Sequence, residues 1–152
     1  LNMVGLPVEN SYQVDLETLD LNIKIKPTFA LASILYPYHG TPIETYSIEN
    51  GFLDSNLMPL ETNKSSSLFN FSSKLEKRRI ENLHKLFGLI VEFSFLRRLT
   101  TFLCSLPLTR VYTGLFYFWY GYNYKIRLFP FRSLRKELGN YIRFWWKTIQ
   151  KK

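Results

Sequence analysis

The segment NMVGLPVEN, residues 2–10, passes from apolar side chains through Gly5 and Pro7 to the acidic Glu9. Its first part, residues 2–6, predicts a short buried strand that Gly5 and Pro7 bring to an end. If the sheet is parallel, the loop after this strand lies at the carboxyl edge, where α/β folds bind ligands. The alternative is that Gly5 and Pro7 only make a turn.

A helix and a second strand are expected next. Asn10 and Ser11 are residue types that cap helices, and the apolar positions that follow keep near-helical spacing until Pro27. Residues 29–36, FALASILY, carry no charge, which is typical of a strand covered on both faces. The order strand, helix, strand predicts a βαβ unit with a right-handed crossover.

The division of the remaining chain follows from capping and composition. Thr41, Pro42 and Glu44 predict a capped helix that ends near Gly51. The Ser- and Asn-rich stretch that follows is the best linker in the sequence. We therefore divide the chain into residues 1–55 with the βα units, a linker at 56–72, and a helical region at 73–152.

The helical region is expected to hold three helices. Ser73 and Glu76 form a capping box for a long helix that reaches about Leu103, before Pro107. A second helix is expected from about Thr109 to Tyr120, then a Tyr- and Gly-rich turn region, then a basic helix from about Phe131 to the C-terminus.

Charge separates the two halves of the 152-residue chain. Residues 1–63 hold two bases and eight acids, for a net charge of −6, whereas residues 64–152 hold 18 bases and four acids, for +14. The lone Cys104 excludes an intramolecular disulfide and is compatible with a reducing compartment. Neither a membrane-spanning apolar run nor a signal-peptide pattern is present in the sequence, so we expect a cytoplasmic protein, either free or peripheral to the membrane.

Several short motifs, in order and at consistent spacing, resemble one enzyme family. The strand ending in GLPVEN, the helix followed by KP and a strand, and the loop YPYHGT resemble the C-terminal part of the catalytic barrel in radical S-adenosylmethionine enzymes. The nearest group has an N-terminal cobalamin-binding domain. The resemblance covers about residues 1–55 and implies an α/β fold: the C-terminal βα units of a partial TIM-like (β/α) barrel, followed by a mainly α-helical basic tail.

The resemblance also implies which residues contact S-adenosylmethionine or substrate. In the first loop these are Gly5, Pro7 and Glu9; in the second they are Tyr36, Pro37, Tyr38, Gly40 and Thr41. Glu9 would accept hydrogen bonds from a ligand or, alternatively, favour the helix that follows through its dipole. The chain departs from the family pattern at Val8, where Gly is usual, and at His39, where Pro is commoner.

The chemistry that the family implies needs an iron-sulfur cluster that cleaves S-adenosylmethionine. The cluster-binding CxxxCxxC motif is absent from this chain, and one cysteine cannot hold a cluster. The resemblance therefore implies a C-terminal portion of such an enzyme, with the cluster ligands and any cobalamin domain upstream of Leu1. The parent enzyme would methylate, cyclise or rearrange an unreactive carbon centre of a small-molecule or lipid-like substrate, whereas this chain alone would be inactive.

A second class of function remains open, namely a non-catalytic membrane-surface or binding module. The tail combines aromatics with bases, and Trp145 and Trp146 beside Lys147, Lys151 and Lys152 resemble the end of an interfacial helix. The alternative is that these aromatics pack on the barrel. Single-stranded nucleic acid also suits this composition and is the least favoured partner.

Overall fold

The computed structural model describes residues 1–54 and 66–128. The chain divides into two compact units, Leu1–Trp119 and Tyr120–Lys152. The elements in chain order are β1 (Asn2–Val4), α1 (Ser11–Ile25), β2 (Ala32–Ile34), α2 (Pro42–Glu49), α3 (Lys74–Glu92), the 3-10 helix η1 (Ser94–Leu99), α4 (Thr100–Ser105), α5 (Thr109–Tyr122) and the π-helical η2 (Asn123–Leu128). The first unit therefore includes helices from both sides of the expected linker. Residues 56–65 of that linker lie outside the described ranges.

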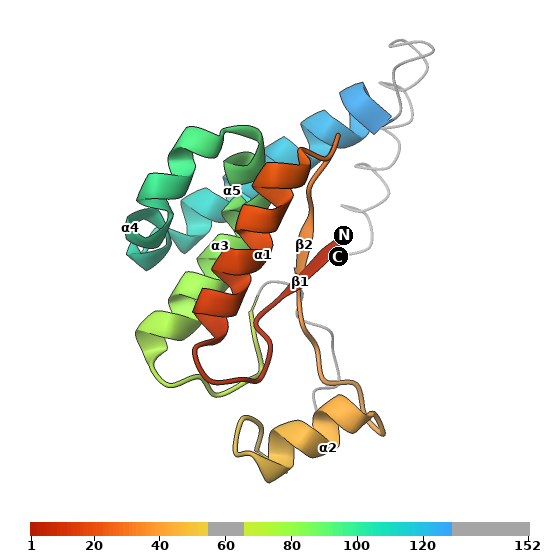
Figure 1. Cartoon of the computed structure of the whole chain (residues 1–152), viewed down its shortest axis with the longest axis vertical. Coiled ribbons are helices and arrows are strands. Elements are labelled where there is room, and N and C mark those ends of the chain that lie inside the picture. Colours follow the sequence, from red (N-terminus) through yellow and green to blue (C-terminus); the bar gives the residue numbers. More distant parts are fainter. Residues whose placement is uncertain (55–65, 129–152) are drawn as a thin grey trace, which may run out of the picture. The chain divides into compact units, whose positions relative to one another are not determined.

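The two strands form a parallel pair joined by α1, as the sequence predicts. Asn2 pairs with Ala32 and Val4 with Ile34. One further hydrogen bond, from the Leu35 amide to the Val4 carbonyl at 2.9 Å, extends the ladder past the last pair. Both strands therefore end at the same edge of the sheet, and in Figure 1 both run toward the end of the unit where α2 lies. The mixed α/β class is confirmed for the described residues.

Helices α1 and α3 cover one face of this sheet. Val4 and Ala32 are buried with Leu19 of α1 and with Leu83 and Phe87 of α3. Alternate strand residues point to opposite faces. Met3, which precedes the buried Val4 in β1, is 56% exposed, so the second face of the sheet lacks such a cover in the described part of the chain.

Paired amides and a left-handed cap fix the C-terminal end of α1. Asn2 and Asn22 exchange side-chain hydrogen bonds at 3.1 and 2.9 Å, which ties this end of α1 to the start of β1. Lys26 adopts a positive φ of 52° and donates its amide to the Asn22 carbonyl. The helix ends at Ile25, two residues before Pro27, in agreement with the expected stop.

The long helix expected from Ser73 to about Leu103 is interrupted. Its cap is confirmed, because the Ser73 hydroxyl accepts the Glu76 amide at 3.0 Å. However, α3 ends at Glu92, and Phe93 leaves the helical region with φ −106° and ψ 73°. The prediction missed this break because the apolar pattern continues across it.

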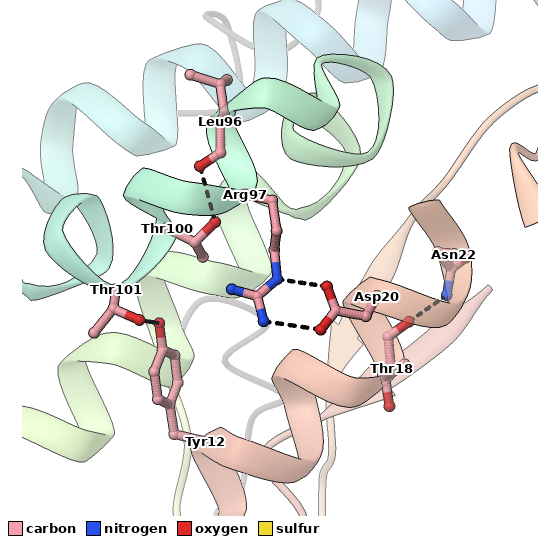
Figure 2. Close-up of polar contacts among 8 residues, drawn as sticks. All are labelled: Tyr12, Thr18, Asp20, Asn22, Leu96, Arg97, Thr100 and Thr101. Carbon is pink, nitrogen blue, oxygen red and sulfur yellow. Dashed lines mark hydrogen bonds and ion pairs between the residues drawn. The ribbon is translucent and has the colours of Figure 1, made fainter. Parts of the chain in front are cut away.

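The break after α3 allows the following segment to contact α1. The Arg97 guanidinium of η1 binds the Asp20 carboxylate through two nitrogens, the second at 2.8 Å (Figure 2). In α4, the Thr101 hydroxyl lies 3.5 Å from the Tyr12 hydroxyl. The 3-10 segment thus turns the chain so that η1 and α4 pack over α1 and α3.

The last described elements differ in part from expectation. Helix α5 begins at Thr109 as predicted and runs to Tyr122, and the π-helical η2 occupies the expected turn region. The basic helix expected from Phe131 lies outside the described residues. Of the helices described, none combines the length and the apolar character needed to cross a membrane.

Candidate ligand-binding edge of the sheet

Two loops leave the carboxyl edge of the parallel strand pair. The first loop, residues 5–10, joins β1 to α1, and the second loop, residues 35–41, joins β2 to α2. All eight residues that the resemblance implicates belong to these loops. The register of the strands therefore places both groups at one edge, the position at which parallel sheets bind ligands.

Gly5 in the first loop occupies a left-handed and crowded position. Its φ is +75°, and a Cβ atom added there would lie 3.1 Å from Cγ2 of Ile80 on α3. Its amide donates to both carboxylate oxygens of Asp15 on α1, at 3.1 and 3.0 Å. Only glycine meets the conformational and the steric requirement together.

Asp15 is the site residue that the sequence analysis missed. Its side chain is buried, with 1% exposure for the residue. Burial raises the pKa of the Asp15 carboxyl to about 7; the Gly5 hydrogen bond opposes this shift, and the charge of Glu76 adds to it. A usable clue was present, since Asp15 lies four residues before Leu19, on the side of α1 that faces the core.

The other residues of the first loop divide into buried and exposed. Pro7 is buried and Glu9 is exposed, so of the two only Glu9 is accessible to a ligand. Asn10 is the N-cap of α1, as predicted, but it has φ 55° and its side chain makes no capping bond. Val8 does not have a positive φ, and the replacement of Gly there is compatible with this loop.

The second loop keeps its shape through contacts among neighbours in sequence. Gly40 has φ +76°, and its amide donates to Glu44 Oε2 at 2.8 Å. Glu44 Oε1 lies 3.1 Å from Nδ1 of the exposed His39. The hydrogen bond from Gly40, followed by that from His39, lowers the pKa of the Glu44 carboxyl.

The capping box expected at Thr41 and Glu44 is therefore replaced by a different arrangement. The Thr41 hydroxyl donates to the Tyr38 carbonyl at 2.5 Å and makes no capping bond. The Tyr36 and Tyr38 rings lie 5.1 Å apart at a tilted angle, and Tyr38 is 60% exposed while Pro37 is buried. Of the eight residues that the resemblance implicates, the exposed ones are thus Glu9, Tyr38 and Gly40.

An iron-sulfur cluster does not fit the residues of this chain. The sequence contains one cysteine, Cys104, and burial raises the pKa of its thiol to about 12. In residues 1–54 and 66–128, no group of three or more His, Cys, Asp and Glu side chains could hold a metal ion. Any cluster would need ligands from outside this chain.

His84 of α3 lies in the interior of the first unit. It is 7% exposed, its ring lies 5.2 Å from the ring of Phe116, and burial lowers its pKa to about 4. A neutral imidazole packed in this way has a structural role.

Comparison with protein-family models, curated proteins and solved structures gives no match to this chain.

Proposed function

We propose that this chain is the C-terminal part of a radical S-adenosylmethionine enzyme, of the group with a cobalamin-binding domain. The observation that carries the proposal is the position of the GLPVEN and YPYHGT loops at one edge of a parallel strand pair. The parent enzyme would act on an unreactive carbon centre by methylation, cyclisation or rearrangement. S-adenosylmethionine, an iron-sulfur cluster and cobalamin are the cofactors proposed for the parent.

The one-sided packing of the sheet supports a barrel origin. In a (β/α) barrel each strand has helices on its outer face and the barrel interior on the other. Here α1 and α3 cover the face that contains Val4 and Ala32, and Met3 on the other face is exposed. A segment taken from a partial barrel would have this same arrangement, with two parallel strands covered by helices on one face only.

Two exposed groups are suited to hold S-adenosylmethionine. The exposed Glu9 carboxylate would accept hydrogen bonds from its ammonium or ribose hydroxyl groups. The exposed Tyr38 ring would pack against an apolar or aromatic part of the ligand. Gly5 and Pro7 are buried, so they would shape the loop rather than contact the cofactor.

A comparison of two glutamates tests the proposal in the intact reading frame that contains this chain. Production of 5′-deoxyadenosine by the reconstituted protein is measured for wild type, Glu9→Gln and the control Glu49→Gln, which changes an exposed glutamate of α2. We expect Glu9→Gln to raise KM for S-adenosylmethionine by about tenfold, the value of one charge-assisted hydrogen bond, and Glu49→Gln to leave it unchanged.

A second experiment uses the 152-residue chain alone. Incubated with iron and sulfide, it should show no stoichiometric cluster absorbance and no cleavage of S-adenosylmethionine. Robust 5′-deoxyadenosine production by the isolated chain, or an intact reading frame without a CxxxCxxC motif, would contradict the proposal.

A further inference from the structure

One side of η1 and α4 carries exposed apolar side chains. Phe95 is 70% exposed, Leu99 52% and Phe102 65%, and these residues are spaced by four and three positions. Residues on the other side of the same segment, Thr100 and Cys104, are fully buried. One side of the segment therefore packs in the core, and the other side exposes large apolar groups to solvent.

Helix α5 continues this pattern. Val111 is 56% exposed, Leu115 39% and Phe118 72%, again at helical spacing. Next to them, Tyr112 is buried and donates its hydroxyl to the Leu103 carbonyl at 2.9 Å. The inner side of α5 thus fixes the helix to α4, while a neighbouring side is apolar and exposed.

Aromatic contacts join the two stripes. The Phe93 ring centroid lies 6.2 Å from that of Phe95 on η1 and 5.8 Å from that of Trp119 on α5. Phe93, which is 42% exposed, thus contacts both η1 and the half-buried Trp119 of α5. We call the exposed stripes of η1, α4 and α5, with Phe93 between them, the aromatic surface.

The segment that forms the aromatic surface is basic. Residues 93–119 include three arginines and no acidic residue. Arg97 pairs with Asp20, whereas Arg98 and Arg110 are exposed. Large apolar groups that alternate with arginines suit the boundary between the headgroups and acyl chains of an anionic bilayer.

The part of this surface on η1 and α4 lies away from the edges that further barrel strands would use. Within the first unit, α1 and α3 lie between the sheet and α4, as Figure 1 shows. Added strands would pair along β1 or β2, not on the outer side of α4. A symmetric contact with a second copy would bring arginines of the two copies together, which opposes association.

We propose that the aromatic surface binds the surface of an anionic lipid bilayer without crossing it. The proposal is independent of the function proposed above, because it rests on η1, α4 and α5 and not on the loops of the sheet edge. It also differs from the expectation that the basic tail at residues 131–152 supplies membrane contact.

Vesicle co-sedimentation of the full chain tests the proposal. The test variant combines Phe95→Ser, Phe102→Ser and Phe118→Ser; the control combines Leu1→Ser, Leu21→Ser and Ile25→Ser, which removes three exposed apolar side chains elsewhere. On phosphatidylcholine vesicles that contain phosphatidylserine, we expect the test variant to bind at least about tenfold more weakly than wild type. The control should bind like wild type, and pure phosphatidylcholine should bind the wild type more weakly.

Two further measurements distinguish membrane binding by the aromatic surface from binding by the basic tail. A Trp145→Ser, Trp146→Ser variant changes the tail, and we expect it to keep most of the binding. Hydrogen exchange of the wild-type chain should slow within residues 93–118 when phosphatidylserine vesicles are added. This measurement does not depend on the folding of any variant. The proposal is overturned if exchange there is unchanged, if only the tail variant loses binding, or if the test variant alters self-association and not vesicle binding.

Discussion

The two loops at the sheet edge contain glycines with nearly the same backbone conformation, Gly5 at φ +75° and Gly40 at φ +76°, in opposite surroundings. Gly5 is enclosed by Ile80 and held by the buried Asp15, which belong to other elements. Gly40 has no atom within 4 Å of an added Cβ, and its partner Glu44 is four residues away. The first loop is thus held by tertiary structure and the second by its own sequence.

This difference suggests different roles in the proposed site. A loop fixed by buried contacts keeps its geometry when a ligand arrives, whereas a loop held by exposed local contacts can adjust. Glu9 projects from the fixed loop and Tyr38 from the locally held one. We therefore expect the first loop to provide a constant anchor and the second to account for most of the adaptation to a ligand.

The largest expected effect concerns Asp15 and pH. Its pKa is raised to about 7 in the folded chain from an ordinary value of 3.8, mainly by burial. The stabilisation by the protonated carboxyl is fully present below the unfolded pKa and is lost as pH rises to about 7. This group should lower the free energy of unfolding by on the order of 3–4 kcal/mol across that window.

Urea unfolding followed by circular dichroism at several pH values checks this, with Asp15→Asn as the neutral variant. The amide keeps an oxygen that can accept the Gly5 amide but does not ionise. The difference between wild type and variant isolates Asp15 from the other carboxylates. Parallel stability profiles for the two proteins between pH 4 and pH 7 would show that Asp15 is not the group responsible.

The second prediction compares the two glycines directly. Both Gly5→Ala and Gly40→Ala force a Cβ into a left-handed conformation, at a cost of about 1 kcal/mol. Only Gly5→Ala also brings that Cβ to 3.1 Å from Ile80 Cγ2, so it should destabilise the chain by about 3 kcal/mol in total. Equal losses of unfolding free energy in urea would mean that the first loop is no more constrained than the second.

The sequence was sufficient for the parts of this arrangement that depend on local pattern. Chain order, the parallel βαβ unit, the start of α3 at its Ser73 cap and the start of α5 all follow from periodicity, Pro and Gly positions, and capping residues. These features are encoded within a few residues of where they occur.

The sequence was insufficient where distant residues decide the outcome. Helix α3 ends at Glu92, and the segment after it contacts α1, for example through Arg97 and Asp20. These two residues are 77 positions apart in sequence. The burial of Asp15 depends on α1 packing under the first loop and near Glu76 of α3, and the capping residues Asn10 and Thr41 are used differently from the prediction. Local pattern cannot report such contacts, because they exist only once the elements have packed.

The smallest expected effect tests the local hold on the second loop through Glu44→Gln. Because the pKa of Glu44 is lowered from 4.5, its ionised form stabilises the loop above that pH, and the effect is lost as pH falls through the folded pKa. Glu44→Gln should therefore reduce the protection of the Gly40 amide from hydrogen exchange by about two- to fivefold at neutral pH, since exposed contacts of this kind are weak. The protection of the Gly5 amide is the internal control and should not change, because its acceptor is Asp15. Loss of protection at Gly5 together with Gly40 would show that the two loops are coupled, and the contrast between a tertiary hold and a local hold would fail.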